Sequence, residues 1–173
     1  MPEWVTGPAA RTDKATQGHP RQLGTIAGVA RPTVTNLHEL AFAYVKAVDG
    51  FAGAGAAFDQ LEGRMDTLRG RKMYGVVYPG DPIRYLACLL LDDENADDLG
   101  FERTTVPAGR YAHTLVRDWE SRISELPAIV SQLESDIKVS GLTVDRDRPW
   151  LEFYRRIDEL LVMLPVLPEG NHP

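Results

Sequence analysis

The stretch MYGVVYPGDPIRYLACLLLD, residues 73–92, decides the fold class of this chain. It contains two runs rich in β-branched, aromatic and other apolar residues, Met73 to Tyr78 and Arg84 to Asp92. The residues between them, Pro79-Gly80-Asp81-Pro82, are typical of a tight turn. The stretch therefore predicts two neighbouring β-strands.

The residues before this stretch predict a strand followed by a helix. Leu40 to Val48 is a strand candidate that places Phe42 and Tyr44 on one side. A helix then follows, because apolar residues recur at spacings of three and four and form one stripe. Gly70 stands just past this stripe, where a glycine commonly ends a helix. The stripe consists of Phe58, Leu61, Met65 and Leu68.

The second half of the chain repeats this order. Strands are expected at Phe101 to Val106 and Arg110 to Val116, and later at Trp150 to Arg155 and Glu159 to Val166. Between the two pairs lies an amphipathic helix that Gly141 is expected to end. Its apolar stripe consists of Ile123, Leu126, Val130, Leu133 and Ile137.

The order strand, helix, strand, strand thus occurs twice, at about residues 33–92 and 101–166. We expect an α+β fold of two pseudo-twofold repeats, with an antiparallel sheet, helices packed on one side and a central ligand cleft. Residues 33–168 form this domain. Residues 1–32 have no helical or strand periodicity and are expected to be a flexible tail, or alternatively an arm that covers a partner subunit.

Composition narrows the classes of function. The 173 residues are 43% hydrophobic and 25% charged, as is usual for a globular protein, and Cys88 is the single cysteine. The net charge of −6 argues against nucleic-acid and anionic-membrane surfaces as direct partners. No stretch reaches the roughly 18 apolar residues of a membrane span. We expect a cytoplasmic protein, monomer or homodimer, whose partner is a small molecule or a protein.

The stretch Pro149-Trp-Leu-Glu-Phe-Tyr154 contains the main candidate for a functional site, because a carboxylate interrupts an aromatic strand. Alternation places Glu152 on one face with Trp150 and Tyr154, and Leu151 and Phe153 on the other. If the second face meets the helices, Glu152 points into the cleft. Burial would then raise its pKa unless a cation compensates, and a ligand cation is one such group. The alternative is an exposed edge strand with Glu152 in water.

Further aromatic residues are candidates for the walls of the cleft. Tyr44, Tyr78 and Tyr111 lie on predicted strands at matching repeat positions, and Trp119 precedes the second helix. Each is alternatively a core or rim aromatic. The four histidines are far apart and no glycine-rich phosphate loop follows a strand, so neither a metal nor a cofactor is predicted. The acidic segment 92–98 is expected to be a solvated loop.

Several short motifs, in this order, resemble the GyrI-like domain, the effector-binding domain of bacterial transcription activators. In the first half they are Ala43-Tyr44-Val45, Tyr74 to Tyr78 leading to Asp81-Pro82, and Arg84 to Cys88. In the second half they are Val106 to Ala112 and Leu151 to Tyr154. The chain departs from the family at Asp118-Trp119-Glu120, where many members carry a Gly-Pro-like turn, and it has no DNA-binding module.

The resemblance implies two repeats around a cleft that binds hydrophobic, often cationic, small molecules, with Glu152 at the position of the family's pocket acid. It implies first a stand-alone binding protein for toxin or drug sequestration or sensing. A second possibility is a cyclopropanoid-type hydrolase that uses Glu152 with Tyr111 or Tyr154. A third is an interaction with DNA gyrase through the acidic segment 92–98. The implied ligand-binding residues are Glu152, Tyr154, Tyr111, Trp119, Tyr44, Tyr78 and Trp150.

Overall fold

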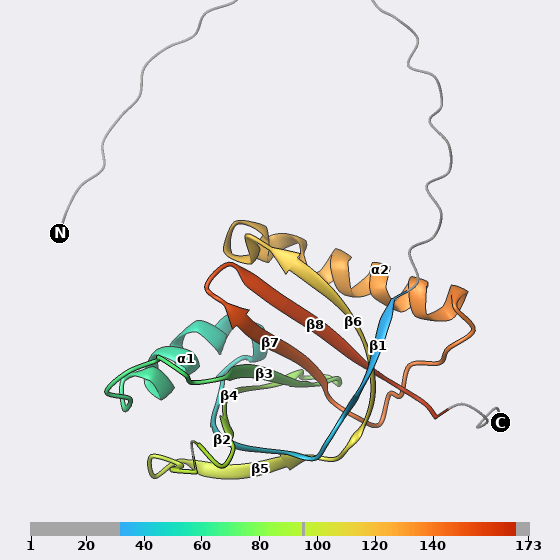
Figure 1. The fold of residues 1–173 in the computed structure, drawn as a ribbon. Coiled ribbons are helices and arrows are strands. Elements are labelled where there is room, and N and C mark those ends of the chain that lie inside the picture. The colour runs from blue at the N-terminus through green and yellow to red at the C-terminus, as the bar shows by residue number, and fades with distance from the viewer. Residues whose placement is uncertain (1–31, 95, 169–173) are drawn as a thin grey trace, which may run out of the picture.

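Eight strands form one antiparallel sheet, in the order β1-β6-β8-β7-β3-β4-β2-β5 (Figure 1). The computed structural model describes residues 32–94 and 96–168, so all of the expected tail 1–32 except Pro32 lies outside the described residues. The predicted α+β class is confirmed, with an antiparallel sheet and helices on one side. The strands are β1 (Thr33–Leu37), β2 (Leu40–Lys46), β3 (Met73–Tyr78), β4 (Arg84–Leu91), β5 (Glu102–Val106), β6 (Gly109–Arg117), β7 (Trp150–Arg156) and β8 (Glu159–Val166).

The two halves of the chain exchange their edge strands. Each strand of the first half has a counterpart in the second: β1 and β5, β2 and β6, β3 and β7, β4 and β8. When every strand is replaced by its counterpart, the order read from one edge becomes the order read from the other edge. β1 pairs with β6 of the second half, and β5 pairs with β2 of the first half. β1 was not predicted, because its residues Thr33–Leu37 are mostly polar and lack the apolar pattern of a half-buried strand. Each half has the order strand, strand, helix, strand, strand. Descent of the two halves from one repeated unit stays a prediction.

The sheet is curved so that the end of β1, at one edge, lies close to the start of β2, near the other edge (Figure 1). Only His38 and Glu39 separate β1, at one edge, from β2, which is the last strand but one at the other edge. Leu37 and Leu40 are therefore at most about 11 Å apart. A sheet of eight strands curled in this way encloses an interior that side chains can fill.

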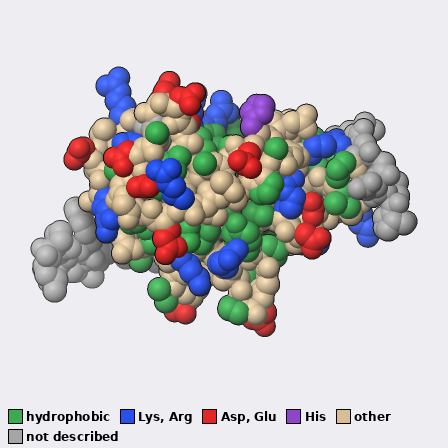
Figure 2. All heavy atoms as spheres, turned by 90° about the horizontal axis from the view of Figure 1, so that it is seen from below, with side chains coloured by type: hydrophobic (Ala, Val, Ile, Leu, Met, Phe, Trp, Pro, Cys, Tyr) green, Lys and Arg blue, Asp and Glu red, His purple; other side chains and the backbone are tan. Residues whose placement is uncertain are grey.

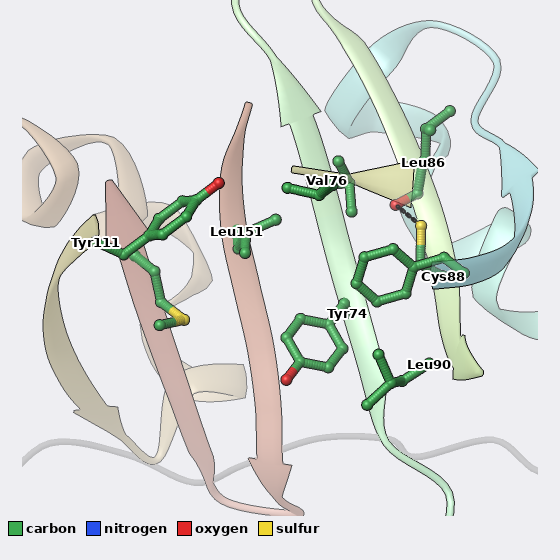
Figure 3. Packing of buried hydrophobic residues seen from close by; sticks show 10 residues of the cluster. Tyr74, Val76, Leu86, Cys88, Leu90, Tyr111 and Leu151 are labelled. Carbon is green, nitrogen blue, oxygen red and sulfur yellow. Dashed lines mark hydrogen bonds between the residues drawn. The ribbon is translucent and has the colours of Figure 1, made fainter. Parts of the chain in front are cut away.

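Apolar side chains fill the inner face of this curved sheet. Tyr74, Val76, Leu86 and Leu151, from β3, β4 and β7, belong to one buried cluster (Figure 3). Cys88 lies among them, fully buried, and donates weakly to the Leu86 carbonyl oxygen at 3.5 Å. The whole buried cluster is Phe42, Tyr74, Val76, Leu86, Cys88, Leu90, Val106, Tyr111, Leu151 and Met163.

Two helices cover the outer face. α1 (Ala54–Glu62) buries Ala57 and Leu61 against β2, β3 and β4, and α2 (Leu126–Val139) buries Leu133 and Ile137 against β6 and β8 (Figure 1). A short 3₁₀ segment precedes each helix, η1 (Gly50–Gly53) before α1 and η2 (Trp119–Glu125) before α2. Asp49 and Asp118 stand before these segments in the left-handed conformation, which aspartate tolerates better than most residues.

The first predicted helix is too long. α1 ends at Glu62 with Gly63 as its C-cap, so Met65 and Leu68 lie beyond the helix, and Leu68 is 49% exposed. Glycine has a low helix propensity, which favours this early end. The second helix ends as predicted, with Gly141 at a φ of 77° just beyond it. Its α-helical part starts at Leu126, and the earlier stripe residue Ile123 is 60% exposed.

Candidate functional site

Glu152 lies on the outer face of the sheet, at the seam between the two halves. It is the third residue of β7 and pairs across the seam with Gly75, the third residue of β3. A Cβ atom on Gly75 would overlap the Tyr85 hydroxyl and lie 2.8 Å from Glu152 Oε2. The missing side chain therefore provides the space in which the Glu152 carboxylate and the Tyr85 hydroxyl meet.

Two tyrosine hydroxyls hold the carboxylate. Tyr85 of β4 donates to Glu152 Oε2 at 2.7 Å, and Tyr154 of β7 donates to the same oxygen at 3.2 Å. The two hydroxyl oxygens are 3.1 Å apart. The group is enclosed, because Glu152 is 4% exposed and Tyr85 is fully buried. These three residues are called the acid cluster below.

Burial dominates the electrostatics of the acid cluster. Desolvation raises the pKa of Glu152, and the hydrogen bonds from Tyr85 and Tyr154 oppose that shift without cancelling it. Desolvation also raises the pKa values of Tyr85 and Tyr154, so both hydroxyls keep their protons and act as donors. Within residues 32–94 and 96–168, no Lys or Arg forms an ion pair with Glu152. A cation brought beside it would stabilise its ionised form.

Aromatic rings surround the acid cluster. Phe58 of α1 contacts Tyr154 and Tyr85 edge-on, with centroids 5.1 and 6.3 Å apart. Trp119 of η2 contacts Tyr154 at 5.1 Å, so each half of the chain contributes a ring. Phe51 of η1 contacts Tyr85 at 5.5 Å and is 44% exposed, which makes it an outer ring of the group. Ring faces attract cations, so this shell favours a ligand that is both apolar and positively charged.

The structure brings four of the seven predicted ligand-binding residues together. Glu152, Trp150, Tyr154 and Trp119 all lie on the face that carries the helices. The condition under which Glu152 was predicted to point into the cleft, that Leu151 and Phe153 face the helices, is not met, because both pack into the inner face. The reason is that the curved sheet buries both of its faces, so an apolar side does not by itself indicate the helix side.

The other three predicted residues do not reach Glu152. Tyr44, Tyr78 and Tyr111 lie on the inner face, and the expectation that they share a cleft with Glu152 is corrected accordingly. The Tyr44 hydroxyl donates to the Glu102 carboxylate, and Arg84 lies over the Tyr78 ring at 3.7 Å. Tyr111 is fully buried and donates to the Pro149 carbonyl oxygen at 3.3 Å.

Sequence reasoning missed four residues of the site: Gly75, Tyr85, Phe51 and Phe58. Tyr85 opens the apolar run of β4, in which every second residue points to the same face. That alternation groups Tyr85 with Ala87 and Leu89, but only the pairing of β3 with both β4 and β7 brings it to Glu152. Phe58 was predicted to be a core residue in the apolar stripe of the first helix. Its contact with Tyr154 joins the first half of the chain to the second half, so the residues around Phe58 do not indicate it.

Ion pairs and hydrogen bonds hold the residues at both ends of the acidic segment 92–98. Asp92 pairs with Lys72 at 2.9 Å, and Asp98 pairs with Arg103 at 2.6 Å. Asp97 and Asp98 also accept hydrogen bonds from the backbone of Leu99 and Gly100. Acidic and basic side chains are mixed across the face seen in Figure 2, without a large region of one sign. Direct binding of gyrase by this loop stays a prediction.

The described residues show no metal site and no membrane helix. Within 32–94 and 96–168, no three His, Cys, Asp or Glu side chains are grouped so that they could hold a metal ion. None of the helices in the same ranges is long and apolar enough to cross a bilayer.

No family model and no curated protein sequence matches this chain. Its fold is similar to that of SAV2435 bound to tetraphenylphosphonium, with a TM-score of 0.54 and 15% identity over 82% of this chain and 96% of that one. A candidate bacterial transcription regulation protein from Staphylococcus aureus has a TM-score of 0.49 and 12% identity over 79% of this chain and 98% of that one. A hydrolase from Listeria innocua has a TM-score of 0.49 and 14% identity over 82% and 94%. At such identities the likeness to SAV2435 describes the fold, and the two weaker matches add no argument.

Proposed function

We propose that this chain is a small-molecule-binding protein of the GyrI-like kind, and that it takes up hydrophobic cations beside Glu152. The observation that carries the proposal is a carboxylate 4% exposed, enclosed by aromatic rings and held by two neutral hydroxyls. An ionised carboxylate in such surroundings is unfavourable unless a positive charge accompanies it. A bound cation supplies that charge.

The surroundings of Glu152 also indicate that the ligand is hydrophobic. The rings of Phe51, Phe58 and Trp119 offer apolar surface and ring faces, and the small, strongly hydrated cations gain little from such surfaces. A lipophilic cation loses little hydration when it enters the site, and it gains contact with both the apolar surface and the ring faces. The fold similarity to a protein solved with tetraphenylphosphonium supports the same ligand class. Sequestration or sensing of toxic cations is the role that fits these properties.

The test is the binding of tetraphenylphosphonium to the whole chain, measured by isothermal titration calorimetry. We expect Glu152→Gln to weaken binding by about 1–3 kcal/mol, roughly ten- to a hundredfold, because a charge partner is lost. Glu159→Gln is the matched control. Glu159 is the other buried carboxylate in the part of the chain that the structure describes, 6% exposed, and it lies among Arg117, Arg155 and Arg156. Equal affinity in the wild type and Glu152→Gln would refute the proposal.

A hydrolytic activity is a second candidate, favoured by one observation. Glu152 has a raised pKa and lies within hydrogen-bond distance of the Tyr154 hydroxyl, as a general base beside a proton donor would. Tyr85 is the second possible donor, whereas Tyr111 is on the other face and does not take part. Turnover of an electrophilic cyclopropane substrate that Tyr154→Phe lowers about a hundredfold would support this activity. Tight binding without turnover would exclude it.

A further inference from the structure

Binding beside Glu152 requires one of the surrounding side chains to move. The carboxylate is 4% exposed, and rings of α1, η1 and η2 pack around the acid cluster. Protein interiors are close-packed, so a ring can leave its place only where empty space adjoins it. The residue that admits a ligand should therefore border both the aromatic shell and a void.

Trp150 meets this condition. On one side, Trp150 packs against the cluster of Ala57, Val77 and Tyr85. The centroids of the Trp150 and Phe51 rings are 6.0 Å apart. Its other side lines a hollow of about 120 Å³ between α2 and the segment that leads into β7. The apolar lining of this hollow consists of Pro79, Val130, Val144, Trp150, Leu164 and Pro165.

The hollow has an apolar lining and is partly open to solvent, so it can receive part of an indole. An enclosed apolar cavity of about 150 Å³ holds a whole benzene molecule. In this smaller and open space of about 120 Å³, one edge of the indole would be covered and the rest would stay in contact with solvent. The ion pair between Arg146 and Glu134, at 2.7 Å, belongs to the same lining. Its guanidinium could stack on an incoming indole, since arginine packs well on aromatic faces.

The hydrogen bonds of the site also single out Trp150. The hydroxyls of Tyr85 and Tyr154 are bound to Glu152, and the Trp119 indole donates to the Ile157 carbonyl oxygen at 3.1 Å. For the Trp150 indole, no hydrogen bond is found with any residue that the structure describes. Moving this ring breaks packing contacts alone.

We propose that Trp150 determines which ligands enter: its indole moves into the hollow and leaves a ring-sized place beside Glu152. Trp150 precedes Glu152 by two residues on the same face of β7, so the two Cα atoms are about 7 Å apart. The place left empty fits one flat aryl group of a cation whose charge faces the carboxylate. The inference rests on the proposed function and narrows its ligand class to cations that carry an aryl group.

Filling the hollow tests this inference. Val130→Phe, on α2, takes the space that the indole needs, and we expect it to weaken tetraphenylphosphonium binding by about tenfold or more. Val139→Phe is the matched control, because it makes the same change on the same helix at a position that is 64% exposed and outside the hollow. Val144→Ile adds less volume to the same hollow and should give a smaller loss. Thermal unfolding of each variant checks that it folds.

Removal of the indole supplies the decisive comparison. When Trp150 is replaced by alanine, no indole has to move into the hollow. In this Trp150→Ala background, Val130→Phe should therefore change the affinity for tetraphenylphosphonium by no more than about threefold. Wild-type affinity in both Val130→Phe and Val144→Ile would overturn the inference, and so would an equal tenfold loss with and without Trp150. Neither result would affect the role of Glu152. A wild-type protein that does not bind tetraphenylphosphonium would instead overturn the proposed function, and the inference with it.

Discussion

Glu152 is stabilised by hydroxyl groups where most buried acids are stabilised by a basic side chain. Two phenols donate to one of its oxygens, and Gly75 provides the room in which they meet. Such bonds lower the pKa of an acid, but burial outweighs them here. The free protein therefore keeps a site whose charge is only partly compensated. If the proposed function holds, this site favours a cation at some expense of stability.

Replacing Glu152 by glutamine should stabilise the free protein at neutral pH. Because the pKa in the folded protein is raised above 4.5, the folded state binds the proton more tightly than the unfolded chain does. Stability therefore falls as the pH rises from 4.5 through the raised pKa, and Glu152→Gln avoids that loss. We expect a gain on the order of 1 kcal/mol at pH 8 and almost none at pH 4, measured by urea unfolding.

The control for this experiment is Glu120→Gln, on the exposed side of η2. A surface change of this kind should alter stability by less than about 0.5 kcal/mol at either pH. A Glu152→Gln protein that is less stable than the wild type at pH 8 would show that the carboxylate is fully compensated in the free state.

Ligand affinity should depend on pH in the opposite sense to stability. A cation gains from Glu152 only when the carboxylate is ionised, so tetraphenylphosphonium should bind more weakly as the pH falls through the raised pKa. Titrations from pH 8 downwards should show a loss that approaches that of Glu152→Gln, roughly ten- to a hundredfold, once the pH is below the raised pKa. Glu152→Gln itself should show no such dependence, and a parallel decline in both proteins would assign the effect to another group.

The seam between β3 and β7 depends on the absence of a side chain at Gly75. Gly75→Ala should destabilise the protein by about 1–3 kcal/mol, because its Cβ would meet Tyr85 and Glu152 in a filled space. Gly55→Ala is the matched control, since no atom lies within 4 Å of a Cβ at that position in α1. Alanine there should be neutral or stabilising by about 0.5–1 kcal/mol. Thermal unfolding measures both, and equal effects would contradict this account of the seam.

The sequence was informative about elements and less so about their ends. Both strands of residues 73–92 and the helix over Leu126–Val139 were predicted, because apolar periodicity and turn residues act over a few positions. The first helix was extended to Leu68 because its stripe continues past the point where Gly63 ends the helix. β1 was missed, since an edge strand such as Thr33–Leu37 is recognised by its pairing with β6 and not by its own residues.

The two halves of the chain interlock, so neither should fold alone. Among the strands of residues 32–94 and 96–168, β1 pairs with β6 of the second half alone, and β5 covers the edge of β2 in the first half. Each half cut at the loop 92–98 would expose unpaired strand edges and one side of the acid cluster. We expect no cooperative thermal transition from either half.

The whole chain should show one transition in which far-ultraviolet circular dichroism and tryptophan fluorescence coincide, as cooperative single domains do. Separate midpoints for the two signals would contradict this interlocked arrangement. So would a folded half whose transition resembles that of the whole chain.

The sequence by itself determined the α+β class, most of the strands and the second helix, and it singled out Glu152, Trp150 and Tyr154 as candidate site residues. All of these depend on patterns within a few residues, where alternation and helical period are directly visible. Only the tertiary structure decided which face of β7 meets the helices and that Tyr85 and Gly75 complete the acid cluster. It also moved Tyr44, Tyr78 and Tyr111 to the inner face. The reason is that strand order and sheet curvature bring residues together across the two halves, and no local pattern contains that information.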